Sequence, residues 1–337
     1  MLIANFFHIK ATNGLFYYGL DYLHALRHKP SRILARPALT AILRDQFPGI
    51  PVVSCTGSRY LIEVSKAIRF RDTIFTPSSH PLPFFSRQVV VLHDTYPFLG
   101  RYGLIKRFLF VLSARSSRCR LAYVNCSVGL AFYRSCGFDQ DRLVFAPNFI
   151  PDQVTLLERN RKVCDGRVIV GLVGTDSPKK NYDSLFAAVR DLGNSRSFTF
   201  RIFGHPTEYF RSVMERFPEI NVHLEPSDQK SIFSFLGQID VLISVAEYEG
   251  FGRPIACALK AGVPCYLLES PVFLEFFSGG AHFFKDIHSL LDHLLKAWSG
   301  PGLPEVHLQF PAPVLEGFSE ALALLDESAV GCEGAEN

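Results

Sequence analysis

Residues 244–264, with the sequence SVAEYEGFGRPIACALKAGVP, carry the clearest structural pattern in this chain. An apolar run from Ile239 to Val245 leads into an acidic turn that is rich in glycine. The small residues from Pro254 to Ala261 then predict a helix that ends at Gly262, because proline is favoured in the first helical turn and glycine just after the last. The stretch therefore predicts a strand, a turn and a helix, in that order.

The predicted turn suits an anion. The backbone amides of Gly250, Phe251 and Gly252 stand at the start of the helix, where the helix dipole adds partial positive charge. Glu249 precedes them and can accept hydrogen bonds from hydroxyl groups. A carboxylate beside a phosphate-binding turn suits a ligand that carries both groups, such as a nucleotide sugar. An ordinary turn with a solvated glutamate is the alternative interpretation of the loop alone.

The same segment resembles the donor-binding signature of the retaining GT-B glycosyltransferases of family 4. Their pattern is Glu-Gly-Phe-Gly-x-Pro-x-x-Glu, followed by an Ala-x-Gly-x-Pro turn. The residues that fit it are Glu249, Gly250, Phe251, Gly252, Pro254, Ala261, Gly262 and Pro264. The second glutamate of the family, which holds the ribose hydroxyls of the nucleotide, is replaced by Cys257. Since a thiol is a weak hydrogen-bond partner, ribose binding is expected to be made differently, weakened or lost.

A second segment carries the resemblance upstream. Gly174 and Thr175 follow an apolar strand predicted for Val168 to Val173, and Lys179 and Lys180 come shortly after. Two cations at the carboxyl edge of a parallel sheet form a plausible clamp for a diphosphate. The alternative is a solvated pair at a helix start. The segment is similar to the family's Gly-Thr-x-x-Pro-Arg-Lys-Asn form, whose cations bind the donor diphosphate, a variant common among bacterial enzymes that use mannose or rhamnose.

The first half of the chain supplies the other candidate site residues. His93 and Asp94 end an apolar strand, and the segment is similar to the family's Val-x-x-His-Asp motif. The resemblance implies that they line the sugar end of the site. Gly14 lies where the family has a glycine-rich loop near the donor phosphates. A helix-capping aspartate and a histidine satisfied within a loop are the alternative for the first pair.

Metal ions and other cofactors are not expected. Asp139 and Asp141 match an Asp-x-Asp metal motif, but they lie in a polar turn, and a solvated turn is the preferred interpretation. The eight cysteines have no zinc-type spacing. Lysines and a helix start can neutralise the negative charge of the diphosphate without a metal ion. The expected co-substrate is therefore a GDP-, dTDP- or UDP-linked sugar alone.

The charge of the chain is unevenly divided. Residues 1–160 carry 20 Lys and Arg against 9 Asp and Glu, or +11, and residues 161–337 carry 15 against 23, or −8. Within the basic half, residues 101–120 mix arginine and lysine with large apolar residues. Such a helix can lie on an anionic membrane, and a helix with one buried and one solvated basic face is the alternative. No nucleic-acid-binding motif accompanies the charge.

Short apolar segments alternate with amphipathic ones along the chain, which indicates an α/β protein with parallel sheets. The resemblance implies GT-B architecture, in which two Rossmann-like domains face a central cleft. We expect an acceptor-side domain at 1–160, a donor-binding domain at 161–312, and a helix at 313–337 that crosses back toward the first domain.

Together these features predict a retaining, metal-independent hexosyltransferase. It would move a mannose- or rhamnose-type sugar to a glycan or lipid-linked acceptor of cell-surface polysaccharide or lipopolysaccharide. His93, Asp94, Lys180 and Glu249 are the expected catalytic residues. A non-catalytic nucleotide-sugar-binding protein and a nucleotide-sugar epimerase are the alternatives. With no secretion signal and no run of apolar residues long enough to span a bilayer, we expect the protein in the cytoplasm, at most peripheral on the inner face of the membrane.

Overall fold

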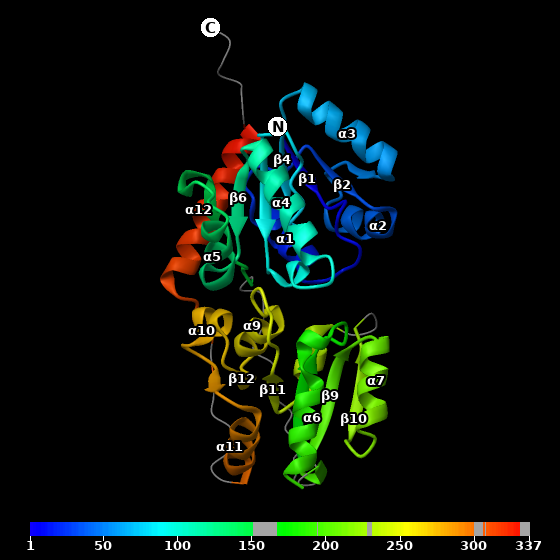
Figure 1. The fold of residues 1–337 in the computed structure, drawn as a ribbon. Helices are drawn as coiled ribbons and strands as arrows, with labels where there is room; N and C mark the ends of the chain where they lie inside the picture. Colours follow the sequence, from blue (N-terminus) through cyan, green and yellow to red (C-terminus); the bar gives the residue numbers. More distant parts are fainter. Residues whose placement is uncertain (151–166, 194, 228–230, 300–305, 307, 331–337) are drawn as a thin grey trace. The chain divides into compact units, whose positions relative to one another are not determined.

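The computed structural model describes residues 1–150, 167–193, 195–227, 231–299, 306 and 308–330. The chain divides into two compact units (Figure 1). Unit 1 comprises Met1–Phe149 and Pro311–Asn337, and unit 2 comprises Ile150–Phe310. The boundary predicted between residues 160 and 161 lies outside the described residues, so it stays a prediction.

Unit 1 is built on a sheet of seven parallel strands in the order β3-β2-β1-β4-β5-β6-β7. The strands are β1 (Leu2–Asn5), β2 (Arg32–Ala35), β3 (Val52–Ser54), β4 (Thr73–Thr76), β5 (Gln88–Leu92), β6 (Arg120–Tyr123) and β7 (Leu143–Phe145). Every residue of β1, β4 and β5 is buried, as expected for central strands of a parallel sheet covered on both faces. Their carboxyl ends meet at one edge, where ligands of such sheets collect.

The helices of unit 1 connect these strands. They are α1 (Gly14–Ala25), α2 (Pro37–Gln46), α3 (Gly57–Arg69), α4 (Gly103–Ser117) and the short α5 (Ala131–Ser135), which a π turn at Cys126–Leu130 precedes. Asn13 caps α1, because its Oδ1 accepts hydrogen bonds from the amides of Leu15 and Phe16 at 3.1 and 3.3 Å. This cap fixes the direction in which the chain leaves the edge of β1.

The last described helix, α12 (Ala312–Val330), belongs to unit 1 although it follows unit 2 in sequence. It contacts β1, β4 and β7. A side chain at Gly317 would overlap the ring of Phe145 on β7, so the close approach needs glycine here. At the other end of the helix, the Asp326 carboxylate accepts hydrogen bonds from the amides of Arg27 and His28 at 3.3 and 2.8 Å. The helix is therefore an integral part of unit 1.

Unit 2 has a sheet of six parallel strands in the order β10-β9-β8-β11-β12-β13. The strands are β8 (Val168–Val173), β9 (Phe198–Gly204), β10 (Val222–Pro226), β11 (Val241–Ser244), β12 (Cys265–Leu268) and β13 (His282–Phe284). The helices are α6 (Tyr182–Asp191), α7 (Glu208–Arg216), α8 (Ile232–Leu236), α9 (Arg253–Lys260), α10 (Pro271–Phe277) and α11 (Ile287–Ser299). Strands β8 and β11 are neighbours, so the turns that follow them lie side by side.

Candidate functional site

The turn after β8 depends on a glycine. Gly174 has a φ of +91°, a conformation that favours glycine. A Cβ at this position would lie 2.6 Å from Cε of Lys180, so the lysine side chain runs directly over the glycine backbone. Tyr182 holds the same turn from the other side, because its hydroxyl donates a hydrogen bond of 2.5 Å to the Gly174 carbonyl. The turn therefore fixes where the Lys180 side chain lies.

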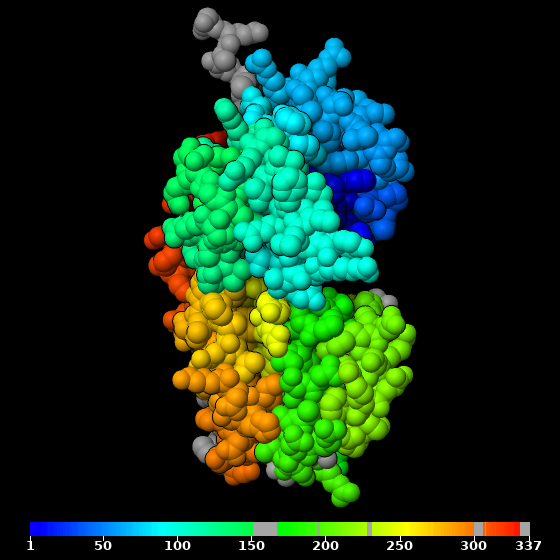
Figure 2. Space-filling view, viewed as in Figure 1, coloured from blue at the N-terminus to red at the C-terminus, as the bar shows by residue number. Residues whose placement is uncertain are grey.

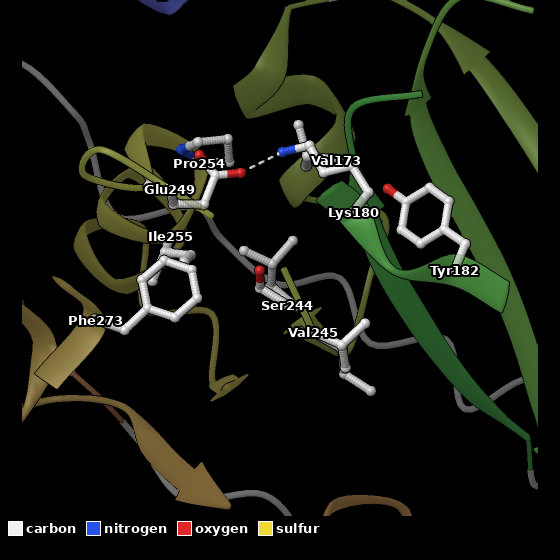
Figure 3. A pocket seen from close by; sticks show the side chains of 12 residues that line it. Val173, Lys180, Tyr182, Ser244, Val245, Glu249, Pro254, Ile255 and Phe273 are labelled. Atoms are coloured by element: carbon white, nitrogen blue, oxygen red, sulfur yellow. Dashed lines mark hydrogen bonds and ion pairs between the residues drawn. The ribbon is translucent and has the colours of Figure 1, made fainter. Parts of the chain in front are cut away.

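The turn after β11 provides the partner of this lysine. Nζ of Lys180 lies 2.7 Å from Oε1 of Glu249, and Nζ of Lys179 lies 3.9 Å from Oε2 of the same carboxylate. Figure 3 shows Lys180 and Glu249 pointing toward each other across the site. The amide of Glu247 also donates to the Lys179 carbonyl at 3.1 Å. Three residues predicted from two separate motifs therefore meet at one place.

Burial and charge act in opposite directions on this ion pair. Burial alone would raise the pKa of Glu249, but Lys180 and Lys179 together hold it below its ordinary value. Burial alone would lower the pKa of Lys180, but Glu249 and the more distant Asp176 raise it. The side chains of the three paired residues are each 16% exposed. The pair is therefore charged at neutral pH, and two ammonium groups face one carboxylate close to solvent.

A pocket lies beside the ion pair and is lined by β8, the turn after β8, α6, β11, the turn after β11, α9 and α10. Its lining residues are Val173, Lys180, Tyr182, Leu242, Ile243, Ser244, Val245, Glu249, Gly252, Pro254, Ile255 and Phe273. In Figure 3 the charged groups lie on one side of this pocket, and Ile255 and Phe273 lie on another. Such a pocket offers charge to one part of a ligand and apolar surface to another part.

The glycine-rich turn of residues 250–252 leads into α9. Gly252 has a φ of +94° and occupies the N-cap position, where no side chain caps the helix. Phe251 is only 3% exposed, and its ring packs edge-on against Phe276 with centroids 4.8 Å apart. Phe251 therefore anchors the turn in the core of unit 2, and the backbone at the start of α9 is held in a geometry that suits an anion.

Two further predicted residues of unit 2 have mainly internal contacts. The Thr175 hydroxyl donates to the His205 carbonyl at 2.6 Å and accepts from the His205 amide at 3.1 Å, so it ties the turn after β8 to the end of β9. Cys257 is buried in α9 and is not among the residues that line the pocket. The donor-binding role predicted for either residue stays a prediction.

The predicted residues of unit 1 follow β5 and β1. His93 is nearly buried; its Nε2 lies 3.3 Å from the Pro77 carbonyl, and its ring stands edge-on to Tyr18 with centroids 4.5 Å apart. Asp94 accepts a hydrogen bond of 3.1 Å from the Tyr96 amide, which forms an Asx turn. Gly14 is the first residue of α1, and the place where a Cβ would lie is open. His93 and Asp94 thus lie at the carboxyl edge of the unit 1 sheet.

The comparison with known families agrees with these two turns. Residues 157–302 match the family model described as glycosyl transferases group 1. The enzyme class predicted from the sequence motifs, a glycosyltransferase, is thereby confirmed. No curated protein matches the chain in sequence.

Solved structures resemble this glycosyltransferase over nearly its full length. HepE from Anabaena, in complex with UDP and glucose, is 15% identical with a TM-score of 0.68, covering 98% of this chain and 94% of HepE. WaaG, a glycosyltransferase involved in lipopolysaccharide biosynthesis, is 12% identical with a TM-score of 0.64, covering 99% and 96%. A glycosyltransferase from Rickettsia africae is 14% identical with a TM-score of 0.62, covering 98% and 93%. At these identities the likeness shows the fold, and the predicted GT-B architecture is confirmed.

The described part of the glycosyltransferase contains no group of three or more His, Cys, Asp or Glu side chains arranged to hold a metal ion. Of the two residues that match the Asp-x-Asp motif, Asp139 precedes a 3-10 turn at Gln140–Arg142 and Asp141 lies within it. Within the same residues, every helix is too short or too polar to cross a bilayer.

Several site residues of the glycosyltransferase are not evident from its sequence motifs. Tyr182 and Ser244 line the pocket, and only their positions beside the two motifs could have indicated this. In unit 1, His8 and His80 stack on each other at the carboxyl edge of the sheet. No local motif links these two histidines, because the contact depends on the pairing of β1 with β4.

Proposed function

We propose that this glycosyltransferase moves a hexose from a nucleotide sugar to a glycan or lipid-linked acceptor in the synthesis of cell-surface polysaccharide or lipopolysaccharide. The observation that carries the proposal is the Lys180–Glu249 pair, held at the carboxyl edge of the unit 2 sheet beside the start of α9. A nucleotide sugar carries both phosphates and hydroxyls. The cationic group and the helix start beside the pocket suit the phosphates, and the carboxylate suits the hydroxyls.

The donor diphosphate takes the place of Glu249 as the counter-ion of Lys180 and Lys179. Glu249 is then released to accept hydrogen bonds from sugar hydroxyls. As the bond from the anomeric carbon to the phosphate oxygen breaks, negative charge grows on the leaving diphosphate, and the lysines and the amides at the start of α9 stabilise it. The acceptor hydroxyl attacks from the same face, its proton passes to the leaving phosphate, and the configuration is retained. No metal ion takes part.

His93 and Asp94 position the transferred sugar and the attacking hydroxyl, and Gly14 gives the donor phosphates access to the backbone of unit 1. Mannose and rhamnose are the favoured sugars because of the Lys179–Lys180 form of the turn after β8. Among GDP, dTDP and UDP, the solved complex of HepE with UDP favours UDP as the first donor nucleotide to test. Because Cys257 is buried outside the pocket lining, the ribose is held by other groups.

The acceptor is brought to the enzyme by an anionic bilayer that contacts α4. Five large apolar residues of this helix are between 53% and 82% exposed; they are Leu104, Ile105, Phe108, Leu109 and Leu112. Their spacing places them on one face of the helix. Arg101 precedes them in sequence, Lys106 and Arg107 lie among them, and all three are exposed. Figure 2 shows the cyan residues of α4 on the surface of unit 1 that faces the viewer. Apolar side chains flanked by arginine and lysine are typical of a helix that lies on an anionic membrane.

The test is a thermal-stability screen of the full chain with UDP, GDP, ADP and dTDP and their sugars, with and without magnesium. We expect one nucleotide to raise the melting temperature without magnesium, and Lys180→Ala to abolish this shift. The control is Lys285→Ala, which removes an exposed lysine elsewhere in unit 2. A shift that needs magnesium, or that persists in Lys180→Ala, contradicts the proposed site.

A second candidate function, a non-catalytic nucleotide-sugar-binding protein, is favoured by Cys257 alone. If the natural site is degenerate, Cys257→Glu should tighten nucleotide binding greatly. Transfer of sugar from the identified donor by the natural protein would exclude this candidate, whereas binding without transfer to any acceptor would support it.

A further inference from the structure

A chain of hydrogen bonds orients one histidine at the carboxyl edge of the unit 1 sheet. Nδ2 of Asn5 donates to the Tyr60 hydroxyl at 3.0 Å, while its Oδ1 accepts from the Phe7 amide at 3.3 Å, so the orientation of the Asn5 amide is fixed. The Tyr60 hydroxyl lies 3.3 Å from Nε2 of His8. Since this hydroxyl already accepts from Asn5, its own proton is available to Nε2. When Nε2 accepts this proton, the neutral ring of His8 carries its own proton on Nδ1, where it can be donated to a ligand.

A second histidine stacks on the first. The rings of His8 and His80 are parallel to within 1°, with centroids 4.3 Å apart. Burial, helped by His80 and Arg36, lowers the pKa of His8 to about 4. Burial and Lys10 also lower the pKa of His80. Both rings are therefore mostly neutral at neutral pH, because burial disfavours their charged forms and positive neighbours repel an added proton.

The surroundings of this pair are positive and lack a counter-ion. Arg36 donates through Nε to the Phe7 carbonyl at 2.8 Å, and its terminal nitrogens have no acceptor among the described residues. Lys10 is exposed and forms no ion pair within the same residues. No carboxylate of the described part contacts either imidazole ring. An anion that binds here therefore meets at least four groups able to donate hydrogen bonds or supply positive charge.

The remaining titratable groups around the pair do not provide the missing negative charge. On α3, Glu63 is engaged by Lys66 at 2.8 Å and by Arg32 at 3.5 Å. Burial raises the pKa of the Cys55 thiol after β3, so this thiol is neutral. Burial also raises the pKa of Tyr60 to about 12. The cluster thus keeps its excess of positive charge across the physiological pH range.

We propose that His8, His80, Arg36 and Lys10 bind a phosphoryl group carried by the acceptor substrate. The inference rests on the proposed function, because it gives unit 1 a substrate. A dianion is favoured over a single carboxylate, since two permanent cations already exceed one negative charge before either histidine gains a proton. The fixed Nδ1–H of His8 and the Arg36 guanidinium supply directed donors, as in other phosphate sites.

Binding of a dianion reverses the electrostatics of the pair. The negative charge raises the pKa of both histidines, so binding under acidic conditions is accompanied by uptake of protons. Affinity should therefore increase as the pH falls. Sulfate is the appropriate first probe, because its charge does not change between neutral and mildly acidic pH, whereas that of phosphate does.

The experiment follows the imidazole NMR resonances of His8 and His80 in the full-length enzyme during titration with sulfate. We expect the pKa of His8 to rise from about 4 to about 5 or above, and sulfate to bind several-fold more tightly near pH 4.5 than near pH 7. Lys10→Gln and Arg36→Gln should each weaken sulfate binding roughly tenfold. Arg134→Gln, which removes an exposed arginine from α5, is the control and should have no effect. Unchanged resonances, or equal losses in the control, overturn the proposal.

A second experiment tests whether this site binds the acceptor or only free anions. A hexose 6-phosphate should shift the His8 resonance at lower concentration than sulfate, and the unphosphorylated hexose should not shift it; equal binding of all three would overturn the acceptor assignment. Lys180→Ala should leave these shifts unchanged. If His8 responds but no nucleotide binds unit 2, the proposed function alone fails. If a nucleotide binds but the His8 resonance does not shift, only the phosphoryl site in unit 1 is contradicted.

Discussion

The Lys180 side chain packs directly against the backbone of Gly174, and no room is left between them for a Cβ at position 174. The position of the cation in the candidate donor site is thus determined by the absence of a side chain six residues earlier in the sequence. Both residues belong to the short connection between β8 and α6, so the site is sensitive to changes that touch no ligand.

Gly174→Ala should reduce both stability and nucleotide affinity. The positive φ makes alanine strained by about 1–2 kcal/mol, and the new methyl group displaces Lys180. Gly193→Ala is the matched control, since Gly193 also has a positive φ but has open space around it. Urea unfolding and calorimetric titration with the donor nucleotide measure the two effects. Equal nucleotide affinity in the two variants would show that the contact with Lys180 is unimportant.

Tyr182→Phe should weaken the same turn without changing its shape. The variant loses the 2.5 Å hydrogen bond to the Gly174 carbonyl, which we expect to cost about 1 kcal/mol of unfolding free energy and to lower nucleotide affinity. Tyr102→Phe, at an exposed position of unit 1, serves as the control. Chemical denaturation and nucleotide titration are the measurements. Unaltered values for both would contradict a supporting role for the tyrosine.

Glu249→Gln should destabilise the protein by about 2–3 kcal/mol at neutral pH, because it leaves Lys180 without its partner in a mostly buried position. The pKa of Glu249 is held below its ordinary value of 4.5, so this contribution is complete above about that pH and is lost as the pH falls through the lowered pKa. The pKa of Lys180 is raised above 10.5, so its contribution is complete below that pH and is lost as the pH rises through the raised pKa.

The corresponding measurement compares the unfolding free energies of the natural protein and Glu249→Gln across pH. The difference should be constant near neutral pH and shrink under acidic conditions. Glu215→Gln, at an exposed position of α7, should show no such dependence. If the difference instead grows on acidification, the ion pair does not stabilise the folded protein in the way that the lowered pKa of Glu249 requires.

Leu104→Glu and Phe108→Glu should each reduce binding to vesicles of anionic lipid by about tenfold or more, because they remove apolar contact and add repulsion. Leu61→Glu is the matched control, since Leu61 is equally apolar, 65% exposed and located on α3. Cosedimentation with phosphatidylglycerol vesicles and with neutral phosphatidylcholine vesicles is the measurement. Comparable losses for Leu61→Glu would show that α4 is not the membrane-contacting face.

Much of the fold could be predicted wherever local signals agree. Strand β8 is a continuous apolar run, and α9 begins with Pro254 in its first turn, so both are evident from sequence. Short strands such as β12 and β13 are not evident, because an apolar run of three or four residues is equally compatible with a loop or part of a helix.

The candidate site divides in the same way. Lys179, Lys180 and Glu249 could be predicted because each stands in a motif at the end of a strand, and the parallel pairing of β8 with β11 then brings them together. The stack of His8 on His80 could not be predicted, because neither residue lies in such a motif. Thr175 and Phe251 match motif positions, yet their side chains serve internal packing, a distinction that a sequence pattern does not contain.

The return of α12 to unit 1 has a consequence for biosynthesis. The polypeptide emerges from the ribosome from its amino end, so the seven strands of unit 1 are synthesised long before the helix that covers β1, β4 and β7. Until then the aromatic side chains of Tyr22, Phe145 and Phe149 lack their covering partner. Unit 2 is made from an uninterrupted segment and needs no later part of the chain, so we expect unit 1 to complete its fold after unit 2.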